Sequence, residues 1–104
     1  MTTAKLSASA AILAELMHGD GYGLDLMERV TQRSKGQVTL TSGNTYPALR
    51  QLEADGLVTS REGDASSDRG GRPRVYYRLT AEGRRAATTQ QQGLLALLLH
   101  PQGV

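Results

Sequence analysis

The order of one helical pattern and two strand patterns in the middle of the chain most constrains its fold. Residues 42–55 carry apolar side chains at helical spacing, and Gly56 is placed to end the helix. Residues 57–62 and 75–79 alternate apolar and polar side chains, as strands with one buried face do. The segment 63–73 is polar and rich in glycine and serine, which predicts a loop. We therefore expect a helix followed directly by a β-hairpin.

Three further helical patterns surround this unit. Residues 7–17, with a serine as N-cap, and residues 22–34 predict the first two helices. Residues 80–100, with a threonine as N-cap and a proline after them, predict the last. Val38–Leu40 is short and alternating, and it predicts a minimal strand. The predicted class is α+β and mainly α, in the order helix, helix, strand, helix, hairpin and helix, which is the plan of a winged helix-turn-helix domain.

The helix within residues 42–55 has two candidate caps. Ser42 is a favourable N-cap type, but Pro47 would then lie where a backbone amide is needed. With Asn44 as the cap, Pro47 takes the third helical position, whose N–H has no partner inside the helix. We therefore expect the helix to begin at residue 43 or 44. The predicted buried face holds Tyr46, Leu49 and Leu52, and the predicted outer face holds Asn44, Ala48, Gln51 and Asp55, with Arg50 on the flank.

The chain is short, and its four aromatic residues are all tyrosine. With 104 residues it is too small for a barrel enzyme or a full dinucleotide-binding domain. Cysteine is absent, which excludes disulfides and thiolate metal sites. No pattern typical of nucleophilic catalysis and no phosphate-cradling glycine loop before a helix is present. We predict a protein that is not an enzyme and that needs no cofactor.

The N-terminal part gives no indication of a membrane or metal site. The alanine-rich segment 8–17 is too short to span a membrane and has no clear signal cleavage site. His18, Asp20 and Asp25 are close in sequence, but no second histidine or cysteine is near them. We expect a cytoplasmic location, no membrane partner and no metal.

The positive charge is concentrated in the second half of the chain. The net charge is only +2, but the segment from Arg69 to Arg78 holds four arginines and no acidic residue. Arginine outnumbers lysine ten to two, and its planar side chain suits forked contacts with phosphate. The patch therefore indicates a contact with phosphate. The alternative is a solvated hairpin face, because Glu62, Asp64 and Asp68 are close by.

Three blocks of the sequence resemble one known family, the PadR-like transcriptional regulators. The first block is residues 11–19, AILAELMHG, with Tyr22 and Gly23 after two intervening residues. The second is residues 42–58, SGNTYPALRQLEADGLV, which is similar to the recognition-helix signature of the family. The third is residues 71–83, GRPRVYYRLTAEG, which is similar to the second half of the family's wing and the entry to its last helix. The resemblance implies a regulator that binds double-stranded DNA.

The residue types in the second block fit a recognition helix, whose first turn meets base edges and phosphates in the major groove. Small polar residues suit a phosphate at a helix N-terminus, although Ser42 and Asn44 have a purely capping role as their alternative. The ring of Tyr46 is expected in the core, with its hydroxyl near a phosphate. The basic hairpin suits the DNA backbone or the minor groove. The predicted DNA-binding residues are Ser42, Asn44, Thr45, Tyr46, Ala48, Arg50, Gln51, Arg69, Arg72 and Arg74.

Leucines gather at the end of the last helix, in residues 94–99, and they are too apolar to face water alone. The first helix carries two apolar rows, and one of them is more than the chain's own core needs. The resemblance implies a homodimer in which the last helix packs with the first. We predict a DNA-binding domain in residues 1–80 and a dimerisation helix in residues 81–104. The predicted dimerisation residues are Leu13, Leu16, Met17, Leu94, Leu95 and Leu98.

Two functions are compatible with this pattern. The first is a sequence-specific DNA-binding regulator, a homodimeric repressor released by a signal that the sequence does not identify. Some members of the family bind small apolar molecules between the helices of the dimer. Phenylalanine and tryptophan are absent here, which disfavours a flat aromatic ligand but leaves room for a smaller effector at the dimer interface. The alternative is a winged-helix module that binds another protein and has no specific DNA binding.

Overall fold

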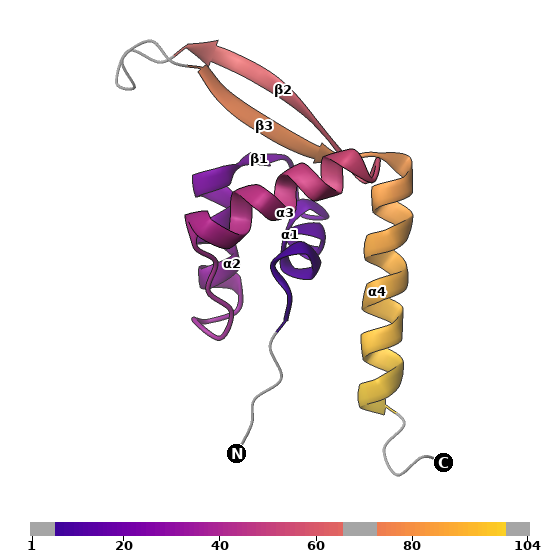
Figure 1. Cartoon of the computed structure of the whole chain (residues 1–104). Helices are drawn as coiled ribbons and strands as arrows, with labels where there is room; N and C mark the ends of the chain where they lie inside the picture. Colours follow the sequence, from indigo (N-terminus) through magenta and orange to yellow (C-terminus); the bar gives the residue numbers. More distant parts are fainter. Residues whose placement is uncertain (1–5, 66–72, 100–104) are drawn as a thin grey trace.

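The computed structural model describes residues 6–65 and 73–99 and contains, within these ranges, four helices and a three-stranded sheet (Figure 1). The helices and strands follow the predicted order, apart from the short first strand. Their bounds are α1 (Ala8–Leu16), β1 (Gly21–Tyr22), α2 (Gly23–Arg33), α3 (Ser42–Ala54), β2 (Val58–Ala65), β3 (Pro73–Leu79) and α4 (Ala81–Leu99).

The sheet is antiparallel, with the strand order β1-β3-β2. Its short strand lies at Gly21–Tyr22, where Tyr22 pairs with Tyr76 of β3. The predicted strand at Val38–Leu40 was wrong, because that segment is irregular and only Leu40 of it is buried. A two-residue strand has no alternation of its own, and its pairing with residues more than fifty positions away cannot be seen in a local pattern.

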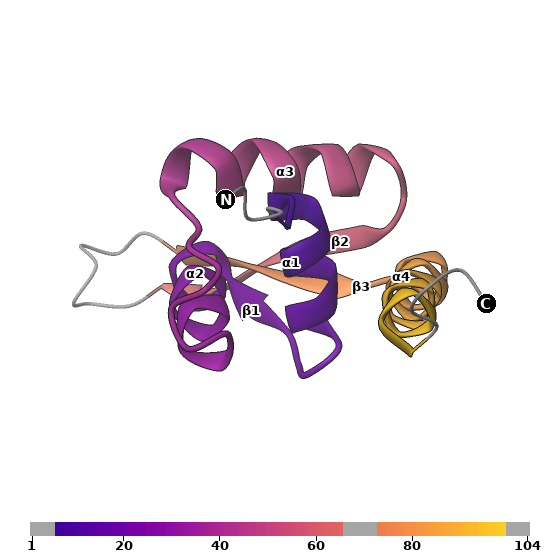
Figure 2. The same cartoon turned by 90° about the horizontal axis from the view of Figure 1, so that it is seen from below.

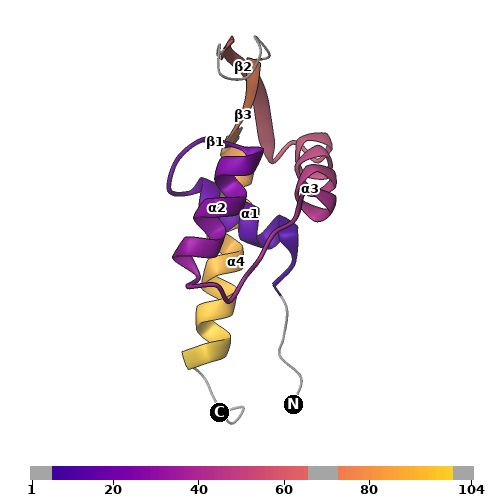
Figure 3. The ribbon, with the colours of Figure 1, turned by 90° about the vertical axis from the view of Figure 1, so that its left-hand side faces the viewer.

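The hairpin strands are longer than predicted. β2 continues to Ala65 and β3 begins at Pro73, so both enter the segment that the sequence assigned to a loop. The pairing is irregular between Glu62 and Ala65, as at a β-bulge, and it resumes with Ala65 opposite Pro73. The hairpin and α4 leave the three-helix unit in opposite directions (Figures 1 and 3). The hairpin is therefore a projecting wing.

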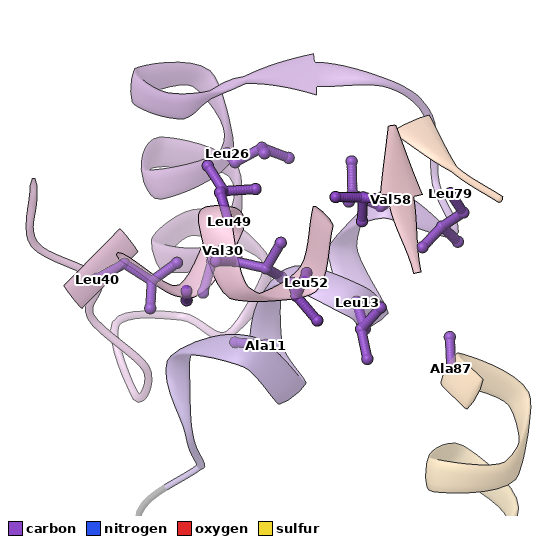
Figure 4. Close-up of a cluster of buried hydrophobic side chains, with 13 residues drawn as sticks. Ala11, Leu13, Leu26, Val30, Leu40, Leu49, Leu52, Val58, Leu79 and Ala87 are labelled. Carbon is purple, nitrogen blue, oxygen red and sulfur yellow. The ribbon is translucent and has the colours of Figure 1, made fainter. Parts of the chain in front are cut away.

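Aliphatic side chains from α1, α2, α3, both long strands and α4 form one core (Figure 4). Ile12, Leu26 and Leu49 are fully buried at its centre. Leu13 and Leu16 are also buried there, so α1 uses both of its apolar rows inside the subunit. The expectation of a spare apolar row on α1 was therefore wrong, because a small core without phenylalanine or tryptophan needs both rows. The dimer contact of Leu13 and Leu16 stays a prediction.

The joint between the wing and α4 is closely packed. The Thr80 hydroxyl accepts a hydrogen bond from the Gly83 amide at 3.0 Å, which confirms the predicted cap, and it donates one to the Gly56 carbonyl at 2.6 Å. Gly83 lies directly against the Leu57 carbonyl, so a Cβ atom at this position would overlap it. Further along α4, Gln90 donates to the Ala10 carbonyl of α1 at 2.9 Å. The first half of α4 is thus fixed to the domain.

Candidate nucleic-acid interface

The helix α3 begins earlier than predicted. Its N-cap is Thr41, whose hydroxyl accepts from the Asn44 amide at 3.3 Å, while the Asn44 side-chain oxygen accepts from the Thr41 amide at 2.9 Å. This reciprocal pair is a capping box, and it outweighs the cost of Pro47 inside the helix. Pro47 and Gly43 both face solvent, where water can bind the carbonyl that lacks a helical partner. Asn44 therefore has a capping role in this structure.

One face of α3 is packed against the core. Thr45 is 0% exposed and Ala48 is 9% exposed, and both lie in one stripe with Leu49 and Leu52. The predicted position of Ala48 on the outer face was therefore wrong, and Thr45 also packs within the subunit. Contacts of these two residues with DNA stay a prediction. Small side chains fit a buried or an exposed face equally well, so their residue types did not reveal this placement.

The opposite face of α3 is polar and exposed, and the helix lies along the outside of the molecule (Figure 2). Gln51 donates to the Asp55 carboxylate at 2.9 Å and retains its own carbonyl oxygen as an acceptor. Arg50 makes no ion pair within the described residues. The predicted outer face did not include Pro47 and Ala54. Their helical spacing from Gly43, by four and eleven residues, places them on the same exposed face. The exposed residues of α3 are Ser42, Gly43, Asn44, Pro47, Arg50, Gln51, Glu53 and Ala54.

Tyr46 is half-buried at the edge of this face and packs against the core. Its ring lies over the backbone of Gly23, and a Cβ atom there would meet the ring and the hydroxyl. Nearby Tyr77 is also partly buried. Burial, with the negative charge of Glu53 close by, raises the pKa of Tyr77 above its ordinary value of 10.0. Both phenols are thus placed between α3 and the sheet.

Two arginines in the described part of the wing, Arg61 and Arg74, lie on tyrosine rings. The Arg74 guanidinium lies 4.4 Å from the centre of the Tyr22 ring. Tyr22 contacts Tyr76 edge to face, with ring centres 5.5 Å apart. Arg61 covers Tyr76 at 5.0 Å. Tyr76 therefore packs against Tyr22 and Arg61 of its own subunit. The predicted contacts of Arg69 and Arg72 lie outside the described residues.

The end of α4 presents an apolar stripe to solvent. Leu94, Leu95 and Leu98 are 51%, 52% and 67% exposed, and Leu97 and Leu99 are exposed still further. Met17, the C-cap residue of α1, is only partly buried. Leu97 and Leu99 were absent from the predicted dimerisation residues, although they belong to the same run of leucines.

These features define a class. A helix with a polar outer face, held across a three-helix core and followed by a projecting β-hairpin, is a winged helix-turn-helix arrangement. Within the described ranges, no helix is long and apolar enough to cross a membrane, and no cluster of three metal-binding side chains occurs.

Comparisons with known proteins specify the family. The model of the PadR-like transcriptional regulator family matches residues 12–89. The chain therefore belongs to the PadR-like family, which consists of transcriptional regulators and not of enzymes.

Solved structures agree with this fold. A PadR family transcriptional regulator from Eggerthella lenta superposes with a TM-score of 0.71 at 27% identity, covering 86% of this chain and 73% of that one. A transcriptional regulator from Clostridium thermocellum gives 0.73 at 24% identity, covering 86% and 81%.

A curated relative from Lysinibacillus sphaericus, described as uncharacterized, is 26% identical over 73 residues. The match covers 70% of this chain and 64% of that protein.

Proposed function

We propose that the chain is a sequence-specific DNA-binding repressor that acts as a homodimer. The observation that carries the proposal is the division of α3 into a buried stripe and an exposed polar face. The domain holds the helix rigidly by the buried stripe, which leaves the other face available for a major groove. Family membership supports the same role.

Gln51 and Arg50 are the proposed base-reading residues. Both lie on the exposed face, and a side-chain amide or a guanidinium can hydrogen-bond two edge atoms of one base. Ser42 lies at the exposed start of α3, where unpaired amides favour a phosphate. The wing arginines Arg69, Arg72 and Arg74 are proposed to contact the backbone or the minor groove.

The leucine stripe of α4 is the proposed dimer contact. Five leucines exposed by half or more form an apolar surface of the kind that marks an interface. Leu6 and Met17, which flank α1 on its two sides, are the apolar side chains of the partner that this stripe would meet, because both stay partly exposed in the subunit. A two-fold dimer would present its recognition helices to half-sites about 34 Å apart, one turn of DNA.

Selection of bound sequences from a random duplex pool tests the proposal. We expect the wild-type protein to enrich a palindromic sequence. The Gln51→Ala variant should relax the preference at one or two positions in each half-site, with a loss of about 1–3 kcal/mol for the preferred duplex only. Gln32→Ala, on the exposed face of α2, is the matched control and should retain the preference. Equal losses on the selected duplex and a random duplex would contradict the reading role of Gln51.

A reporter gene under the selected sequence tests repression. Expression of the protein should lower reporter output, and Gln51→Ala should restore it. An increase in output on expression would identify an activator instead. Absence of any duplex binding at low salt, together with recovery of a stable heteromeric complex, would favour the protein-interaction alternative.

A further inference from the structure

A cavity of about 280 Å³ lies between the start of α2, the first half of α3 and the outer half of β3. Tyr46 lines it on the side of α3, and Pro73, Arg74 and Val75 line it on the side of the wing. Tyr22 and Gly23 line it between them. The cavity therefore separates the recognition helix from the wing.

Arg74 is the charged group of this cavity, and its hydrogen bonding is incomplete. Its Nε atom is buried from solvent, and no described atom accepts a hydrogen bond from it. Arg74 makes no ion pair within residues 6–65 and 73–99. Asp25, the acidic residue in the first turn of α2, is already paired with Arg29 at 2.9 Å. A guanidinium that lines the cavity, with an Nε that has no acceptor and no carboxylate partner among the described residues, favours an anionic ligand.

The surrounding residues fix Arg74 in place. Its guanidinium lies on the Tyr22 ring, and Tyr22 is held by Tyr76 and by strand pairing in β1. Tyr22 also occupies the N-cap position of α2 without a side-chain bond to the helix, so the first amides of α2 add further donors. A donor that is already ordered loses little entropy when it binds its acceptor.

The position of the cavity agrees with the geometry of a duplex. The major and minor grooves lie on the two sides of one sugar–phosphate strand. When α3 occupies the major groove and the wing reaches the adjacent minor groove, this strand must pass between them. We propose that the cavity is the seat of one backbone phosphate, with Arg74 donating to its non-bridging oxygens. This inference rests on the proposed function and adds a specific anchor to it.

A methylphosphonate scan tests the seat directly. Each phosphate of the selected half-site is replaced in turn by an uncharged methylphosphonate, and affinity is measured for the wild type, Arg74→Gln and Arg84→Gln. Arg84 is exposed on α4 and lies outside the cavity, so its variant is the matched control. We expect one position at which the wild type and the control lose about tenfold in affinity, while Arg74→Gln loses almost nothing further. Equal losses for Arg74→Gln and the wild type at every position would overturn the seat.

Salt dependence gives an independent readout. Arg74→Gln should weaken specific and random duplexes equally and lower the slope of log affinity against log salt by about one unit. Tyr22→Leu keeps the charge but removes the ring, so it should weaken binding about threefold with an unchanged slope. Thermal unfolding of each variant checks that the domain remains folded. An Arg74→Gln slope equal to that of Arg84→Gln would contradict the proposal.

Three further outcomes distinguish an error in the seat from an error in the proposed function. Inorganic phosphate at constant ionic strength should compete no better than chloride; selective competition that disappears in Arg74→Gln would assign the cavity to a free phosphate ion and overturn the backbone seat. A wild-type protein that binds no duplex overturns the proposed function and the seat together. A wild type that binds duplex without coupling between Arg74 and any phosphate overturns the seat alone.

Discussion

Glu15 shows how one buried residue supports the proposed DNA-binding surface from a distance. It is 2% exposed and accepts hydrogen bonds from Arg29 at 3.1 Å and from Arg33 at 2.8 Å. Arg29 also donates to the carbonyls of Asp20 and Gly19, so it orders the turn that leads into β1. Because β1 carries Tyr22, the ion-pair cluster helps to position the ring that supports Arg74.

The charge of Glu15 leads to a prediction about acid stability. Burial alone would raise its pKa, but hydrogen bonds and positive charge from Arg33 and Arg29 outweigh burial, and the pKa lies below its ordinary value of 4.5. Its contribution to folding is therefore complete above pH 4.5 and is lost as the pH falls through the lowered pKa. We expect Glu15→Gln to lower the free energy of unfolding by about 2 kcal/mol at neutral pH, and this difference should shrink in acid.

Urea unfolding from neutral to acidic pH measures this difference. Glu28→Gln is the matched control, since Glu28 is exposed and makes no ion pair within the described residues. If the loss of unfolding free energy in Glu15→Gln were the same at every pH, the carboxylate charge of Glu15 would not be its cause.

The elements with strong local signals could be predicted from the sequence, and the elements formed by distant contacts could not. The helices α1 and α2 lie close to their predicted bounds because caps and apolar spacing are local properties. β1 forms only by pairing with β3, which is distant in the sequence. The start of α3 is set by the capping box of Thr41 and Asn44, whereas Pro47 had indicated a later start. Leu49 and Leu52 were correctly predicted on the buried face of α3, because large apolar side chains indicate burial. Thr45 and Ala48 were not, because their small side chains occur on buried and exposed faces alike.

The cap of α3 is itself open to test. Thr41→Ala removes the hydroxyl that accepts from the Asn44 amide, so we expect the free energy of unfolding to fall by about 1 kcal/mol. Thr41→Ser keeps the hydroxyl and should retain most of the stability. Chemical denaturation of the three proteins measures both effects. An alanine variant as stable as the wild type would mean that the capping box does not stabilise the helix.

For the whole molecule, the subunit alone leaves the apolar end of α4 uncovered. The first half of α4 packs on α1, whereas the exposed leucines have no partner among residues 6–65 and 73–99. The division at residues 80 and 81 stays a prediction, and the packing of Ala87 in the core joins the two parts. A dimer is the proposed solution.

Charge placed in the leucine stripe should separate the subunits. Leu95→Asp puts a carboxylate into the proposed contact, where it would lose its water, so we expect monomers at concentrations at which the wild type is dimeric. Sedimentation equilibrium gives the mass, and affinity for the palindromic duplex should fall at least a hundredfold. Thr89→Asp adds the same charge to α4 before the stripe and should remain dimeric. A dimeric Leu95→Asp protein would place the contact elsewhere.

The joint at Thr80 has a consequence for the operators that such a dimer accepts. One hydroxyl ties Gly56, just after α3, to the start of α4, and Gly83 packs directly against the Leu57 carbonyl. The distance and the angle between the two α3 helices of the proposed dimer would therefore be nearly constant. A site with one base pair too many or too few between its halves must then be twisted or bent to fit. The free-energy cost of this deformation falls on the DNA. It depends on how stiff the base pairs between the two half-sites are, so the dimer would select among these base pairs without touching them.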